Sequence, residues 1–170
     1  MYSNMYSKYS LKFALFLGFT VFFALIPTAQ AQFSGPAVTP LSAASIPQTD
    51  QMQPTELVRL LKAGGKTQPV VLQVGSYVMF QQAHIPNSGF AGPASQSNGL
   101  ILLKKLSAPL SKNQLIVIYC GCCPWNRCPN MGTAYKELRD LGFRNVKALY
   151  LPGNFGDDWV AKGYPVERGE

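Results

Sequence analysis

Residues 114–143 read QLIVIYCGCCPWNRCPNMGTAYKELRDLGF, and they hold all four cysteines of the chain within nine positions. The apolar run QLIVIY (114–119) is typical of a buried strand. The stretch MGTAYKELRDLGF (131–143) has apolar residues at helical spacing and a glycine near its end, which predicts a helix. A strand, a cysteine loop and a helix therefore follow one another directly.

The same alternation continues on both sides of this stretch. Two further apolar runs, PVVLQVG (69–75) and NVKALYL (145–151), predict strands, and helical patterns cover residues 54–65, 99–110 and 155–163. Strands that alternate with helices predict an α/β fold, a central parallel sheet with helices on both faces. Ligands of such sheets bind at the carboxyl ends of strands, which is where the cysteine loop begins.

The N-terminus has the pattern of an export signal. Lys8 and Lys12 precede the apolar run FALFLGFTVFFALI (13–26), and Ala29-Gln30-Ala31 offers a cleavage site. We expect a signal peptide over 1–31, a flexible linker over 32–51 and one domain over 52–170, in a periplasmic or secreted protein that meets the membrane only during export. An uncleaved N-terminal anchor remains the alternative.

The charge of the expected mature chain is mildly basic. Removal of residues 1–31 takes away two lysines, so 13 Lys and Arg face 8 Asp and Glu, a formal charge of 13 − 8 = +5. The sequence contains no long run of Lys and Arg, so its charge pattern does not favour nucleic acid as a partner. A weak positive field suits a small anionic substrate.

The cysteine loop allows three kinds of chemistry. A thiol at a strand-to-helix turn lies near unpaired N–H groups and the positive end of the helix, which lower a cysteine pKa, and Arg127 adds a positive charge. This predicts a reactive, anion-binding thiolate. In an oxidising compartment, a Cys123–Cys128 or Cys120–Cys128 disulfide is the second possibility. The spacing C-x-C-C-x4-C fits zinc poorly, but Cys120, Cys122, Cys123 and Cys128 could hold a soft ion such as Cu(I).

Several motifs together resemble the rhodanese-like (sulfurtransferase) domains over residues 52–168. They are the strand IVIYC that ends at Cys120, the helix and strand AYKELRDLGFRNVKALYL, the late W…GYPVE, and upstream PVVLQVG…AHIP. The resemblance implies the rhodanese-like three-layer fold and a cysteine that attacks sulfane sulfur and carries it as a persulfide. It implies no cofactor, a small anionic sulfur donor, a thiol acceptor and a possible redox partner protein. The alternative is a catalytically silent module whose cysteines bind a soft metal or a partner protein.

The resemblance also implies roles for residues of the loop. By position after the strand, Cys120 matches the nucleophile of the family. The family loop is commonly a cysteine, four residues and an arginine, and Cys122 to Arg127 fits that spacing, so Cys122 is the rival. The loop backbone with Arg127 would hold the donor. The residues expected to bind substrate are Gly121, Trp125 and Asn126, and the candidate resolving or disulfide thiols are Cys122, Cys123 and Cys128.

Three residues outside the loop complete the expectations. The chain has Gln73 and Gly75 where the family usually has an acidic residue and an arginine. His84 is the only histidine, and in the matching turn of the family it is structural, so the resemblance implies a bond to backbone rather than catalysis.

Overall fold

The centre of the fold is a five-stranded sheet in which all strands pair in parallel and the order is β1-β5-β4-β2-β3. The computed structural model describes residues 39–65 and 68–169. The predicted α/β class and parallel sheet are confirmed, and the three strands predicted from apolar runs are the three central ones. The strands are β1 (Gln51–Met52), β2 (Val70–Gln73), β3 (Gly89–Phe90), β4 (Ile116–Tyr119) and β5 (Val146–Leu149).

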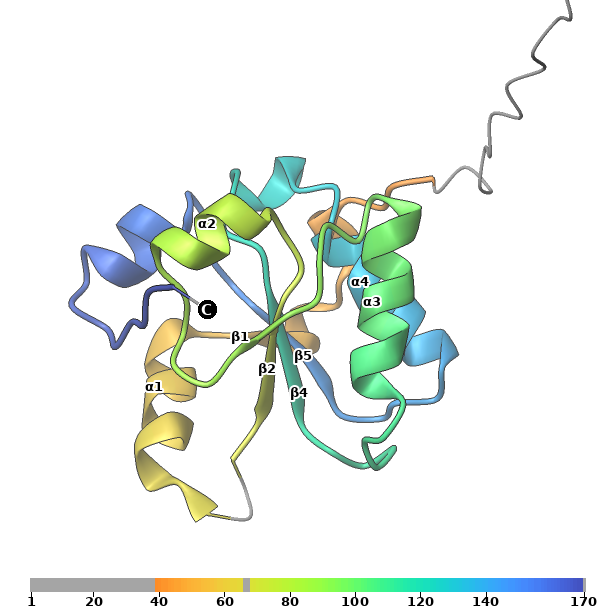
Figure 1. The fold of residues 1–170 in the computed structure, drawn as a ribbon, viewed down its shortest axis with the longest axis horizontal. Helices are drawn as coiled ribbons and strands as arrows, with labels where there is room; N and C mark the ends of the chain where they lie inside the picture. Colours follow the sequence, from red (N-terminus) through yellow and green to blue (C-terminus); the bar gives the residue numbers. More distant parts are fainter. Residues whose placement is uncertain (1–38, 66–67, 170) are drawn as a thin grey trace, which may run out of the picture. The chain divides into compact units, whose positions relative to one another are not determined.

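Helices cover both faces of this sheet, as Figure 1 shows. On one face pack α3 (Ser97–Ser107) and α4 (Met131–Asp140), and on the other α1 (Pro54–Ala63) and the π-helical turn η5 (Gly156–Val160). A short helix that periodicity did not predict, α2 (Tyr77–Gln82), follows β2. Among the described residues, no helix is both long and apolar enough to cross a membrane.

Strand β4 separates two hydrophobic cores. Its residues alternate between the faces, as the period of a strand requires. Ile116, Ile118 and the following Cys120 belong to the core under α3 and α4, whereas Val117 and Tyr119 belong to the core under α1 and η5. Tyr119 therefore points away from the face of Cys120, and its hydroxyl accepts a hydrogen bond from the Ile85 N–H at 3.1 Å.

The structure differs from the expected flexible linker over residues 41–51. The 3-10 turns η1 (Ala43–Ser45) and η2 (Gln48–Asp50) lead into β1, and Ala43 and Ile46 are buried in the core under α3 and α4. Asp50 also accepts hydrogen bonds from Tyr135 and Lys147. The Pro, Ser and Ala composition predicted a linker, but two apolar side chains suffice to anchor the segment. The expected signal peptide lies outside the described residues.

His84 has the structural role expected of it. Its Nδ1 lies 2.8 Å from the Phe80 carbonyl oxygen, and its ring stacks on Phe80 at a centroid distance of 4.0 Å. Glu167 pairs with the residue through a backbone bridge and a carboxylate 3.7 Å from Nε2. The histidine thus fastens the C-terminal segment to the end of α2 and takes no part in the cysteine loop.

Candidate functional site

The cysteine loop lies at the carboxyl edge of the sheet. Cys120 follows β4 directly. The neighbouring strand β2 ends at the same level of the sheet as β4, because their last residues, Gln73 and Tyr119, are paired. The connection from β4 to α4 is eleven residues long, from Cys120 to Asn130. Since α4 begins only at Met131, the positive end of that helix is distant in sequence from Cys120.

Cys120 is a buried thiol with close neighbours. It is 3% exposed, and its Sγ lies 3.2 Å from the Sγ of Cys122 and 3.4 Å from the donating Nδ2 of Asn130. The hydrogen bond with the Cys122 thiol and burial raise the pKa of Cys120 to about 12. The predicted lowering of this pKa is wrong, because the sulfur is enclosed by protein and by other thiols rather than presented to a helix end.

Gly75 lets Cys120 approach the adjacent strand end. A Cβ atom at residue 75 would lie 2.9 Å from the Cys120 Sγ and 3.0 Å from Nε2 of Gln73. Real Cβ atoms do not come so close, so only glycine leaves the sulfur its place. The amide of Gln73, in turn, accepts a hydrogen bond from the Gly75 N–H at 3.1 Å. Gln73 and Gly75, the two positions that depart from the pattern of rhodanese-like domains, thus lie beside the Cys120 thiol.

Cys122 is the exposed member of the cluster. Its Sγ lies between the sulfurs of Cys120 and Cys123, 3.2 Å from the first and 3.4 Å from the second. Cys123 is half-buried, and burial raises its pKa. Among the four thiols, Cys122 is therefore the one that a molecule in solution reaches first.

Cys128 brings a third sulfur to this point from the far end of the loop. It is buried, and the Sγ atoms of Cys120, Cys122 and Cys128 all lie within 4.8 Å of one another. The hydrogen bond with the Cys120 thiol and burial raise the pKa of Cys128 to about 12. All four cysteines are free thiols, so neither of the two disulfides considered from the spacing is formed.

The loop is held by contacts with distant segments. Gly121 has a φ of +73°, and its carbonyl accepts a hydrogen bond from the Phe155 N–H at 3.0 Å. The 3-10 turn η4 (Trp125–Arg127) follows; the Trp125 N–H donates to the Pro152 carbonyl at 3.2 Å, and its ring meets Tyr150 edge-on at 5.1 Å. Trp125 therefore anchors the loop to the segment after β5.

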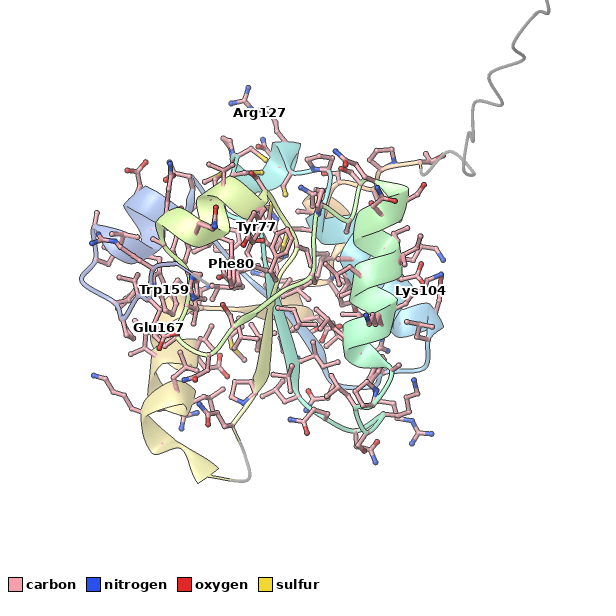
Figure 2. All side chains as sticks on the ribbon, in the orientation of Figure 1. Tyr77, Phe80, Lys104, Arg127, Trp159 and Glu167 are labelled. Carbon is pink, nitrogen blue, oxygen red and sulfur yellow. The ribbon has the colours of Figure 1, made fainter. Side chains whose placement is uncertain are left out.

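Some of the loop N–H groups that were expected to bind an anion already donate hydrogen bonds within the protein. The N–H groups of Trp125 and Arg127 donate to the carbonyls of Pro152 and Pro124, so they are not available to an anion. Asn126 is exposed, and its carbonyl accepts a hydrogen bond from the Ser42 hydroxyl at 3.1 Å. The Arg127 side chain projects outward from the loop (Figure 2), and its charge acts on Cys123. Arg127 can thus attract an anion to the exposed side of the cluster.

A small cavity lies behind the thiols, with a volume of about 10 Å³. That is about the space of one water molecule, so an oxyanion such as thiosulfate does not enter it. Its lining is mainly sulfur and apolar carbon, from Cys120, Gly121, Cys123, Trp125, Cys128, Met131, Leu149 and Leu151. The thiol that such an anion can reach most readily from solvent is Cys122, the exposed member of the cluster.

Asn130 is a site residue that sequence reasoning missed. It is 5% exposed, its Nδ2 donates to the Cys120 sulfur, and its Oδ1 accepts from the Ser95 N–H at 2.9 Å. The sequence did offer one signal, an asparagine directly before the predicted helix, because asparagine is favoured as the capping residue at a helix N-terminus. Here it caps no helix and ties the cysteine loop to the segment before α3 instead.

No protein-family model matches the chain, and no curated protein matches it in sequence. Solved structures do match. The rhodanese-like domain of the Alr3790 protein from Anabaena sp. has a TM-score of 0.53 at 23% identity, over 70% of this chain and 79% of that one. The BH2092 protein from Bacillus halodurans has a TM-score of 0.54 at 23% identity, over 69% and 76%.

A thiosulfate sulfurtransferase from Pseudomonas aeruginosa also matches, with a TM-score of 0.52 at 21% identity. The match covers 71% of this chain but 20% of that protein, so the shared part is one portion of a longer chain. At such identities the likeness concerns the fold. The parallel strand order, the helices on both faces and these three structures agree with the pattern found in the sequence: the chain has the rhodanese-like fold.

Proposed function

We propose that this protein is an exported thiol enzyme of the sulfurtransferase type, in which Cys122 accepts sulfur and Cys120 resolves the product. The observation that supports this most is the contrast in exposure between two thiols that are in contact. Cys122 is exposed and Cys120 is buried, with 3.2 Å between their sulfurs. The spacing from Cys122 to Arg127 also matches the common loop of rhodanese-like domains. These facts favour Cys122 over Cys120 as the nucleophile.

The first step takes place on the exposed thiol. The Cys122 thiolate attacks the outer sulfur of a donor such as thiosulfate; the S–S bond of the donor breaks, sulfite leaves, and Cys122 carries a persulfide. Arg127 lies exposed on the same loop and supplies the positive charge that attracts the dianion. Cys120, with its pKa raised to about 12, stays protonated and does not compete for the donor.

The second step uses the neighbouring sulfur. The persulfide anion takes the proton of the Cys120 thiol, and the Cys120 sulfur attacks the Sγ of Cys122. A Cys120–Cys122 disulfide forms and hydrosulfide leaves, so atoms and charge balance. Two thiols of an acceptor then reduce the disulfide and are themselves oxidised to a disulfide. Sulfite, sulfide and an oxidised acceptor are the net products.

Intact-protein mass spectrometry after incubation with thiosulfate tests this order. We expect the Cys122→Ser variant to gain no sulfur, and the Cys120→Ser variant to gain one sulfur atom and retain it, because its resolving thiol is absent. Cys123→Ser is the matched control and should behave like the unaltered protein. Uptake that persists in Cys122→Ser and disappears in Cys120→Ser would return the nucleophile to Cys120. Unaltered protein that neither gains a sulfur atom nor loses the two hydrogens of a Cys120–Cys122 disulfide would exclude the enzyme.

Export is part of the proposal. The basic N-region, the apolar run and the Ala-Gln-Ala site support it. N-terminal sequencing of the protein recovered after expression of the full chain should begin at Gln32. A protein that still begins at Met1 in the soluble fraction would contradict export.

A further inference from the structure

Cys128 is a buried thiol for which the proposed sulfur chemistry has no use. It is 2% exposed and lies eight residues beyond Cys120, yet the loop brings its Sγ to within 4.8 Å of the sulfurs of both Cys120 and Cys122. The loop thereby encloses two cysteine thiols. Three sulfurs at one point, two of them shielded from solvent, need another explanation.

The spacing of the three sulfurs suits one metal ion. At a metal–sulfur distance of about 2.3 Å, a trigonal site places its sulfurs about 4 Å apart. The separations are compatible with that value, since they are 3.2 Å for Cys120–Cys122 and no more than 4.8 Å for the other two pairs. Small side-chain rotations would therefore convert three thiols into a three-coordinate site.

The donor set selects the class of ion. Among the described residues, the group that could hold a metal contains three cysteines and no histidine, aspartate or glutamate. Thiolates without oxygen or nitrogen donors favour soft ions, with Cu(I) foremost, whereas structural zinc takes four ligands. The sulfur of Met131 belongs to a side chain that lines the same small cavity, and Leu149 and Leu151 complete an apolar wall there. Such apolar surroundings favour an ion of low charge.

Hydrogen-bond donors already point at the two buried sulfurs. The Asn130 Nδ2 donates to Cys120 at 3.4 Å, the Asn130 backbone N–H to Cys128, and the Cys122 backbone N–H to Cys120. Each of these bonds favours the thiolate over the thiol, and together they offset part of the negative charge that three thiolates bring to one ion. Asn130 thus donates hydrogen bonds to Cys120, at the start of the loop, and to Cys128, near its end.

We propose that Cys120, Cys122 and Cys128 form a Cu(I) site, with Asn130 as the positioning residue that orients Cys120 and Cys128. On binding, the three thiols release their protons and each sulfur forms one bond to the ion. A Cys120–Cys122 disulfide removes two of the three ligands, so the oxidised loop releases copper. This inference does not depend on the proposed sulfur transfer, because Cys128 has no part in that reaction.

Anaerobic titration of the reduced protein, expressed from the full chain, with Cu(I) buffered by bathocuproine disulfonate is the test. We expect one equivalent to be retained against the chelator, and X-ray absorption at the copper edge to show three sulfur neighbours. The diamide-oxidised protein should retain none. Zinc ions held as tightly as Cu(I), or copper retained equally after oxidation, would overturn the proposal.

Variants separate this site from the sulfur chemistry. Cys128→Ser should lose stoichiometric copper and still react with thiosulfate as the unaltered protein does, whereas Cys123→Ser should keep copper. Asn130→Ala should weaken copper binding about 10- to 100-fold, as the removal of an outer-shell partner does. Because Cys128 is buried, its substitution could also disturb folding. A second, separate variant, Cys122→Ser, changes the exposed ligand and leaves the core intact, and it should also lose copper. Copper retained by both serine variants would exclude the site, whatever the outcome with thiosulfate.

Discussion

Two neighbouring strands leave the same edge of the sheet by very different connections. β2 reaches α2 through three residues, Val74 to Ser76, whereas β4 reaches α4 through eleven, Cys120 to Asn130. The short connection offers no thiol and little side chain, and its Gly75 leaves room for the Cys120 sulfur. The long connection folds over its own thiols and encloses two of them. The four thiols are thus concentrated in the connection that is long enough to bury two of them.

The two connections also differ in what holds them. The short one is fixed by the Gln73 side chain, which accepts a hydrogen bond from the Gly75 N–H, and by the sheet itself, because the Val74 N–H donates to the Tyr119 carbonyl at the end of β4. The long one depends on segments remote in sequence: Ser42 bonds Asn126, and Phe155 bonds Gly121. The conformation of the long connection should therefore be sensitive to changes in segments outside the sheet.

The largest expected effect comes from Gly121→Ala, which breaks the long connection at its start. Its φ of +73° disfavours any Cβ, and a Cβ there would lie 2.4 Å from the Phe155 Cβ. Left-handed strain and overpacking together should lower the free energy of unfolding by about 3 kcal/mol or more. Urea denaturation measures this loss.

Gly142→Ala is the matched control for that change. Gly142 also has a positive φ, +87°, but nothing lies within 4 Å of a Cβ placed there. It should cost about 1–2 kcal/mol, the backbone strain alone. Equal losses in the two variants would mean that the contact with Phe155 does not constrain the loop.

The next effect is a loss of stability at alkaline pH that originates in the long connection. The pKa values of Cys120 and Cys128 are raised from 9.0 to about 12 in the folded protein. Above pH 9 the unfolded chain loses these protons while the folded chain keeps them, so the folded state binds more protons and its stability falls as pH rises from 9 to 12. Below pH 9 these two thiols add no pH dependence.

Urea denaturation of the reduced protein at neutral pH and at about pH 10 measures this fall. Tyr119, whose pKa is raised to about 12 by burial, adds a similar decline that begins about one unit higher. Cys128→Ser should therefore reduce the fall between pH 9 and 10 without abolishing it at higher pH. An unchanged fall would show that the buried thiols ionise as freely as exposed ones.

The contrast between the connections also decides what a sequence can predict. Continuous apolar runs and helical periodicity located β2, β4, β5 and four of the helices, because each of these elements buries one or two faces against a hydrophobic core. The cysteine spacing located the candidate site at the carboxyl end of β4. These features depend on local pattern and on the general behaviour of parallel sheets.

The interior of the loop depends on contacts that no local pattern encodes. The exposure of Cys122 and the burial of Cys120 follow from the path of the loop after Gly121, which Phe155 and Pro152 fix from more than twenty residues away. The prediction of a lowered cysteine pKa assumed a helix N-terminus next to the loop thiol, but α4 begins at Met131, eleven residues after Cys120. Likewise, the segment 41–51 looked like a linker by composition, although Ala43 and Ile46 bind it to the core.

The smallest expected effect tests whether that segment holds the long connection in place. The Ser42 hydroxyl accepts from the Ala44 N–H, which caps η1, and donates to the Asn126 carbonyl. Ser42→Ala should cost about 1 kcal/mol, the value of a lost cap, and should speed the reaction of Cys123 with a thiol reagent, because η4 loses one of its anchors. In Ser45→Ala, the removed hydroxyl bonds only within the segment, to the Ser42 carbonyl, so the thiol reaction should keep its rate. If both serine variants react alike, the N-terminal segment stabilises the core without restraining the cysteine loop. A faster reaction in Ser42→Ala alone would mean that the enclosure of the thiols is shared between the loop and a segment some eighty residues before it.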